Sequence, residues 1–130
     1  MILTKNDKLR FEVKEDLMKA IKEYVRVILS VLEKGSAEIY LFGSIAKGGY
    51  NEHSDIDLLV ILTGKELDSK QKRVLRIELN GIGCDSYFDS RLDFELDCKV
   101  YGEIDFSNST KSNFFEKDIC KDLIRVTEWR

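Results

Sequence analysis

Two aspartates at the start of an apolar run are the residues of this chain whose type and spacing most suggest chemistry. Asp55 and Asp57 open the stretch DIDLLVIL, which predicts a strand buried on much of both faces. Alternate residues of a strand face the same side, so the two carboxylates converge while Ile56 and Leu58 turn into the core. Like charges this close repel each other unless a cation lies between them. Mg²⁺, which typically takes one or two carboxylates and substrate phosphates, is a natural partner.

A glycine–serine turn precedes the carboxylate pair. Gly43-Ser44 directly follows the short apolar run EIYLF, and ten residues separate Ser44 from Asp55. Glycine lets the backbone approach a ligand closely, and successive backbone N–H groups can cradle a phosphate. A phosphate-binding turn beside a metal-binding carboxylate pair is the equipment of metal-assisted phosphoryl or nucleotidyl transfer. The plainer interpretation is a glycine turn followed by solvated aspartates at the end of a strand.

The stretch 41–60 resembles the nucleotidyltransferase superfamily that includes DNA polymerase beta, whose signature is GS followed at this distance by DxD. The likeness is greatest to its smallest members, the minimal nucleotidyltransferase domains often encoded beside a HEPN-type partner. Those domains carry GSxARG and SDIDLLV, and this chain has GSIAKG at 43–48 and SDIDLLV at 54–60. Lys47 therefore stands where arginine is usual, which keeps the charge but loses the planar two-pronged donor. Residues 113–124 are similar to a segment near the end of such domains, without its glycine.

The resemblance implies a donor nucleotide and a metal. Asp55 and Asp57, together with a third carboxylate, would hold two Mg²⁺ ions. Gly43 and Ser44 would bind the phosphates of a nucleoside triphosphate, with ATP as the donor, and Lys47 would contact the triphosphate.

The family also uses a third carboxylate on a later strand. It takes the proton from the attacking hydroxyl or completes the second metal site. Asp97, in the run LDCKV, is the predicted third acid. Glu95 lies two residues away on the same face and is the first alternative, and Asp93 is the second, because strand register is easily misjudged by two residues.

Hydrophobic periodicity predicts the elements that must position these residues. Apolar spacing of three and four predicts a helix over 14–34, and a second helix is expected over 66–80. Short β-branched, aromatic or alternating runs predict strands; they lie at 38–42, 55–62, 94–101 and 124–126. A polar loop is expected at 107–110 and a short helix at 114–123. The order predicts one domain over 1–130 of α+β (mixed α/β) class, a small mixed sheet with helices packed over one face.

Composition narrows the class of partner. The 21 basic and 24 acidic residues give a formal net charge of −3. The chain therefore lacks the excess of basic residues that is typical of nucleic-acid binders. No apolar run approaches a membrane span, and the first residues lack the apolar region of a signal peptide. The three cysteines have no CxxC spacing. We therefore expect a cytoplasmic protein with free thiols, no membrane partner and no sequence-specific nucleic-acid partner.

The expected function is Mg²⁺-dependent transfer of AMP from ATP to a hydroxyl, and the resemblance implies a partner toxin of HEPN type as the acceptor. One alternative is transfer to a small molecule such as an aminoglycoside, although 130 residues leave little room for the helical domain that such enzymes usually add. The other is a binding module, an antitoxin that neutralises its partner by contact with little or no catalysis. An acid that completes the site favours the enzyme. A homodimer or a hetero-oligomer is compatible with the sequence.

Overall fold

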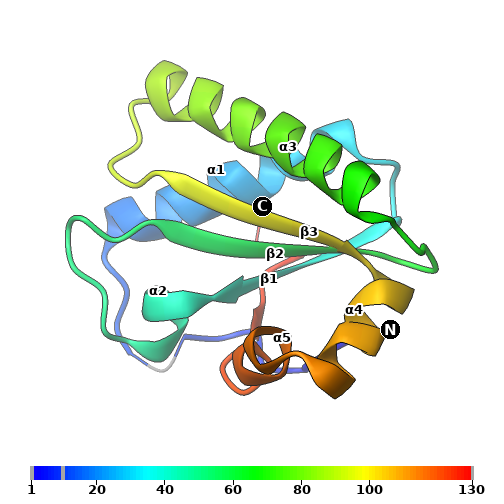
Figure 1. The fold of residues 1–130 in the computed structure, drawn as a ribbon. Coiled ribbons are helices and arrows are strands. Elements are labelled where there is room, and N and C mark those ends of the chain that lie inside the picture. The colour runs from blue at the N-terminus through cyan, green and yellow to red at the C-terminus, as the bar shows by residue number, and fades with distance from the viewer. Residues whose placement is uncertain (1, 10, 130) are drawn as a thin grey trace.

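A four-stranded mixed sheet organises the protein (Figure 1). The computed structural model describes residues 2–9 and 11–129. The strands are β1 (Ala37–Phe42), β2 (Ile56–Leu62), β3 (Leu96–Gly102) and β4 (Ile124–Arg125), in the spatial order β3-β2-β1-β4. β1 runs antiparallel to both β2 and β4, whereas β2 and β3 are parallel. The starts of β2 and β3 therefore meet the end of β1 at one end of the sheet.

Helices cover both faces of this sheet. The longer helices α1 (Glu15–Val31) and α3 (Ser69–Asp89) pack on one face, where inward-facing residues such as Leu41, Leu58 and Cys98 form the larger core. The short helices α4 (Glu103–Ser112) and α5 (Phe114–Ile119) lie at the other face (Figure 1). Phe106 of α4 is the centre of a smaller core there with Leu59. The five-residue helix α2 (Gly43–Lys47) continues directly from β1.

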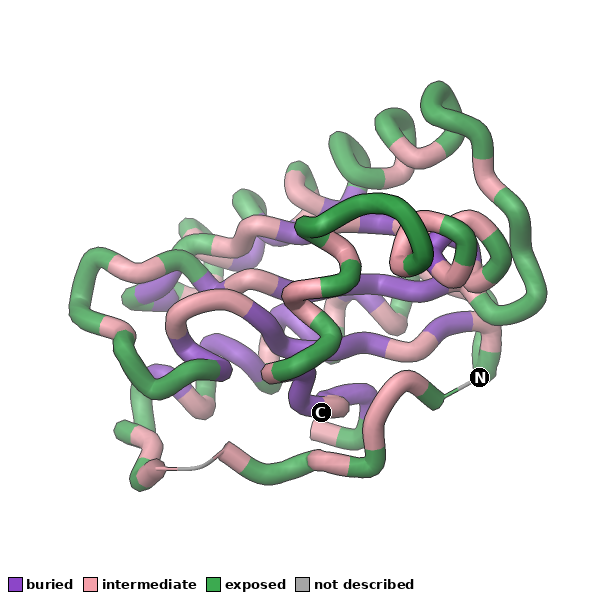
Figure 2. Tube along the Cα trace, turned by 60° about the horizontal axis from the view of Figure 1, so that its bottom comes forward, coloured by how far each residue is buried: buried purple, intermediate pink, exposed green. Residues whose placement is uncertain are grey.

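The central strand β2 is buried from Leu58 to Ile61, as Figure 2 shows for the middle of the sheet. Coverage of both faces explains why its sequence is a continuous apolar run rather than an alternating one. Asp57 is the one polar residue of β2, and it is only half-buried. The apolar run thus fixes the strand, and the half-buried carboxylate is its second residue.

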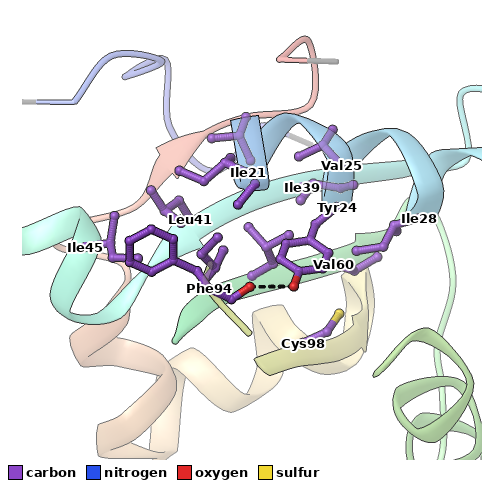
Figure 3. Packing of buried hydrophobic residues seen from close by; sticks show 14 of the residues in the cluster. Ile21, Tyr24, Val25, Ile28, Ile39, Leu41, Ile45, Val60, Phe94 and Cys98 are labelled. Atoms are coloured by element: carbon purple, nitrogen blue, oxygen red, sulfur yellow. Dashed lines mark hydrogen bonds between the residues drawn. The ribbon is translucent and has the colours of Figure 1, made fainter. Parts of the chain in front are cut away.

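A buried tyrosine attaches α1 to the start of β3. The Tyr24 side chain is fully buried, and its hydroxyl donates to the Phe94 carbonyl oxygen at 2.5 Å (Figure 3). Burial is the main cause that raises the pKa of Tyr24, so the phenol remains a proton donor at neutral pH. This bond holds the segment just before Leu96, and with it the beginning of β3.

The predicted fold class is confirmed, with three differences in detail. The helix expected over 66–80 extends to Asp89, through Gly81 and Gly83. Gly83 is buried against Leu96 of β3, and any Cβ at this position would overlap that side chain, so the glycine serves close packing rather than a helix end. The polar loop expected at 107–110 is wrong, because these residues belong to α4.

The third difference concerns the layers: the predicted helices over one face correspond to α1 and α3, and α4 and α5 add a partial second layer. Among the described residues, no helix combines the length and the apolar character needed to cross a membrane.

Candidate active site

The carboxylates of Asp57 and Asp97 project from neighbouring positions of two parallel strands. Asp57 of β2 is the register partner of Asp97 of β3, and adjacent strands lie roughly 4.8 Å apart. Strand alternation places both side chains on the face that also carries Leu59, opposite the core formed with α1. Asp57 is half-buried, and the Asp97 side chain is 47% exposed. The pair is therefore open to a ligand from one side.

Gly43 closes this pair on the side of β1. Phe42, the last residue of β1, is the register partner of Asp57, and the chain turns at Gly43 with a φ of +74°. A Cβ built on Gly43 would overlap the Asp57 carboxylate. Only glycine therefore accepts both this backbone conformation and this approach. The turn and the carboxylate are fitted to each other.

Burial and neighbouring charges oppose ionisation of Asp57. Its pKa is raised from 3.8 to about 6, first by burial, then by the charge of Asp97, and then by that of Asp55, while Lys99 acts in the opposite direction. The Lys99 ammonium lies 3.9 Å from an Asp97 carboxylate oxygen. One cation thus faces three acids, so the site carries an excess of negative charge that a bound cation would relieve.

The other predicted acids, Asp55, Asp93 and Glu95, lie just before the first residues of β2 and β3. The Ile56 backbone N–H donates to the Glu95 carbonyl oxygen at 2.8 Å, and the strand register places Glu95 two positions before the Asp57–Asp97 pair. Asp55 is exposed. With Asp93 and Glu95 it lines a separate hollow of about 210 Å³, which also includes the exposed His53. The register therefore places Asp97, rather than Glu95 or Asp93, beside Asp57, and the catalytic roles of all these acids remain predictions.

The two polar residues of α2 are placed differently from each other. Ser44 is half-buried in the first turn of α2, directly after the glycine that contacts Asp57, whereas Lys47 is exposed at the last residue of that helix. Ser44 is thus the direct neighbour in sequence of the glycine that packs against Asp57. Nucleotide binding by Gly43, Ser44 and Lys47 remains a prediction.

Asn80 of α3 positions the strand that carries Asp97, and its role was not anticipated from the sequence. Its side-chain amide donates to the Cys98 carbonyl oxygen at 3.0 Å, and the Cys98 N–H donates to its carbonyl oxygen at 2.8 Å. The two bonds imitate a neighbouring strand at the residue between Asp97 and Lys99. The only available signal for this role was that Asn80 is a polar residue on the side of the helix that faces a strand. Cys98 itself is buried, and burial raises its thiol pKa to about 12.

The carboxylates of the site could hold a hard cation such as Mg²⁺ only if water or a bound substrate supplied further oxygen ligands. Carboxylate oxygens suit Mg²⁺, and the charge excess around Asp57 favours a cation there. Among the described residues, however, no three His, Cys, Asp or Glu side chains lie close enough to form a metal-binding group. Further oxygen ligands would have to come from water or from substrate phosphates, as is usual for Mg²⁺.

The chain belongs to the nucleotidyltransferase domain family, because residues 18–128 match that family. The match includes the Gly43-Ser44 turn, both aspartates of β2 and Asp97. Membership agrees with the geometry, which brings the turn and two carboxylates to one end of the sheet.

Two proteins of Methanocaldococcus jannaschii are similar over parts of the chain. "Putative protein adenylyltransferase MJ0604" is 49% identical over 43 residues, which cover 33% of this chain and 43% of that protein. "Putative protein adenylyltransferase MJ0141" is 29% identical over 62 residues, which cover 48% of this chain and 63% of that protein. The matched stretches thus span less than two thirds of the length of both relatives.

Two crystal structures show a limited likeness. One is described as a "putative nucleotidyltransferase from Sulfolobus solfataricus"; it is 27% identical, covers 89% of each chain and has a TM-score of 0.49. The other is described as "the toxin-antitoxin with AMP-PNP"; it is 20% identical, covers 80% of this chain and 81% of that one, and has a TM-score of 0.41. Family membership rests on the sequence match over 18–128 and not on these two likenesses.

Proposed function

We propose that this protein is a Mg²⁺-dependent nucleotidyltransferase that transfers AMP from ATP to a hydroxyl group of a partner protein. The observation that carries the proposal is the juxtaposition of Asp57 and Asp97 with Gly43 packed against the Asp57 carboxylate. A pure binding surface would not require two carboxylates in register, one of them half-buried at an energetic cost. An acid that completes the site is the feature expected to distinguish the enzyme from the binding module, and the position of Asp97 beside Asp57 supports the enzyme.

The residues divide between donor and acceptor. Backbone N–H groups of the Gly43-Ser44 turn bind the β- and γ-phosphates, and Asp57, packed against that turn, would hold the metal. The acceptor hydroxyl oxygen forms a bond to the α-phosphorus, the bond from that phosphorus to the bridging oxygen breaks, and pyrophosphate leaves with that electron pair. The Asp97 carboxylate, the more exposed of the pair, accepts the hydroxyl proton.

Asp55, Asp57 and Asp97 are the residues that would hold Mg²⁺, in two ions if all three take part. When bound, the metal neutralises charge on the phosphates and on the leaving group. In its absence the same carboxylates repel each other, which is consistent with the raised pKa of Asp57.

A protein acceptor is supported by the names of the two archaeal relatives, both of which are protein adenylyltransferases by name. Resemblance to minimal domains encoded beside HEPN-type proteins supports a toxin of that type as the partner. No observation on the structure favours an aminoglycoside acceptor.

The test is incubation of the purified protein with isotope-labelled ATP, MgCl₂ and the product of the adjacent gene, followed by intact-mass spectrometry. The expected result is added AMP mass on the partner, absent with EDTA and absent with Asp57→Asn. Tight complex formation without any added nucleotide would instead support the binding module.

A further inference from the structure

A cationic groove lies along the outer side of β3, next to the acid pair. It has a volume of about 410 Å³, with α3 as one wall and α4 and α5 as the other. The two walls lie on opposite sides of β3 in Figure 1. Four cations line it: Lys72, Arg73, Arg76 and Lys99. Glu116 is the one acidic residue among its lining residues. In a chain of net charge −3, this groove is a local concentration of positive charge.

The arginines of α3 have no ion-pair partner within the part of the chain that is described. Lys72 lies 3.6 Å from an Asp105 carboxylate oxygen, and Lys99 contacts Asp97. Arg73 and Arg76 are exposed, and neither is within ion-pair distance of a described acid. Two free guanidinium groups on one wall therefore remain available for a ligand, and guanidinium forks suit carboxylates.

The groove lies on the opposite side of the Asp57–Asp97 pair from the Gly43-Ser44 turn. The Gly43-Ser44 turn follows β1, which adjoins β2 on one side, whereas the groove runs along β3 on the other side. The turn and the groove thus flank the Asp57–Asp97 pair from opposite directions. Lys99 connects the two regions, because it contacts Asp97 and also lines the groove.

We propose that this groove binds an acidic stretch of the acceptor polypeptide, a proposal that rests on the proposed transfer to a protein hydroxyl. The acceptor segment lies along the outer side of β3 from Asp97 to Tyr101, with its hydroxyl at Asp97. Four residues of extended chain span roughly 13 Å. The acidic side chains therefore lie within about four residues of the modified hydroxyl, opposite Arg73 and Arg76.

The binding test uses a short fluorescent peptide with one tyrosine flanked on one side by glutamates, and a matched peptide with glutamines. Affinity is measured by fluorescence anisotropy without nucleotide. We expect the wild-type protein to prefer the glutamate peptide and to lose affinity as salt rises. The double variant Arg73→Glu/Arg76→Glu should weaken binding about ten-fold or more. The control Lys19→Glu/Lys34→Glu makes the same charge change at exposed lysines outside the groove and should have little effect.

Three results would overturn the proposal. The first is equal affinity for the glutamate and glutamine peptides, or equal loss in the groove and control variants. The second is displacement of the peptide by ATP together with loss of ATP affinity in Arg73→Glu/Arg76→Glu, which would assign the groove to the nucleotide. The third is tighter binding of a single-stranded RNA oligonucleotide than of the peptide, through the same arginines. The salt dependence of the wild-type protein tests the proposal even if the double variant does not fold.

The proposal that the groove binds the acceptor and the proposed nucleotidyltransferase function can be refuted by different results. Peptide binding without nucleotide transfer to any protein would refute the proposed function and leave the groove. Transfer to the partner that is unaffected by Arg73→Glu/Arg76→Glu would refute the groove and leave the function.

Discussion

Replacement of Asp57 by asparagine should make the metal-free protein more stable at neutral pH. The folded state raises the pKa of Asp57 from 3.8 to about 6, so it disfavours the ionised carboxylate. A difference of about 2.2 pKa units corresponds to at most about 3 kcal/mol of destabilisation. Because the side chain is only half-buried, water screens part of this cost, and we expect a gain of about 1–2 kcal/mol in Asp57→Asn, or roughly 4–10 °C in Tm.

The sign of the effect follows from protonation. Below about pH 4 the carboxyl is protonated in both folded and unfolded chains, so its ionisation costs nothing. As the pH rises toward 6, the unfolded chain ionises and the folded one resists, and the cost is complete above the folded pKa. The stability advantage of Asp57→Asn should therefore be small at pH 4, grow between pH 4 and 6, and level off above that range.

The assay is thermal and urea unfolding of both proteins between pH 4.5 and 8 in EDTA, followed by circular dichroism. Asp55→Asn is the matched control, because this carboxylate belongs to the same pair but is exposed, and it is only the third cause of the shift at Asp57. It should give a smaller gain. An Asp57→Asn protein that is no more stable than wild type at pH 7.5, or whose gain does not change with pH, would refute the reasoning.

Three further predictions concern catalysis and the frame around it. Asp97→Ala should slow single-turnover transfer by about 10²–10³-fold with a smaller change in triphosphate affinity, whereas Glu95→Ala should have little effect; the reverse pattern would place Glu95 in the role of third acid. Gly43→Ala should destabilise the protein by about 1–2 kcal/mol and weaken binding of a non-hydrolysable ATP analogue in calorimetry, because the φ of +74° and the Asp57 carboxylate both exclude a Cβ; unchanged affinity would remove the turn from the nucleotide site. Asn80→Leu should cost about 1–3 kcal/mol in urea unfolding and also slow transfer, because both backbone groups of Cys98 lose their partner; a stability loss without any change in rate would show that Asn80 has only a structural role.

The strands and the residues at their starts were predictable because local pattern and global fold agree there. β1 and β2 were predicted within one residue at each end, since Gly43 ends the apolar run of β1 and Thr63-Gly64 ends that of β2. The convergence of Asp57 with Asp97 was not fixed by sequence alone. It depends on the parallel register of β2 and β3, and the sequence interpretation left Glu95 open as an alternative for that reason.

The misjudged helices depend on contacts between distant segments. The run SNST in α4 has weak helix propensity, but Phe106 is buried in the smaller core, and the Asp105 carboxylate accepts hydrogen bonds from the backbone N–H groups of Leu67 and Gly102. Tertiary contacts therefore stabilise a helix that local sequence does not favour. Gly83 likewise looks like a helix end until Leu96 of β3 is placed against it.

Both edges of the sheet are occupied by the chain itself, which restricts how another protein can associate with it. Asn80 takes the outward-facing backbone groups of Cys98 on β3, and on the opposite edge the Arg125 N–H donates to the Asn6 carbonyl oxygen. On both edges the chain itself thus takes some of the backbone groups that sheet extension or edge-to-edge aggregation would use. The protein must then recognise a second protein by contacts between side chains. A few surface substitutions would therefore suffice to keep two related pairs of interacting proteins in one cell from cross-reacting.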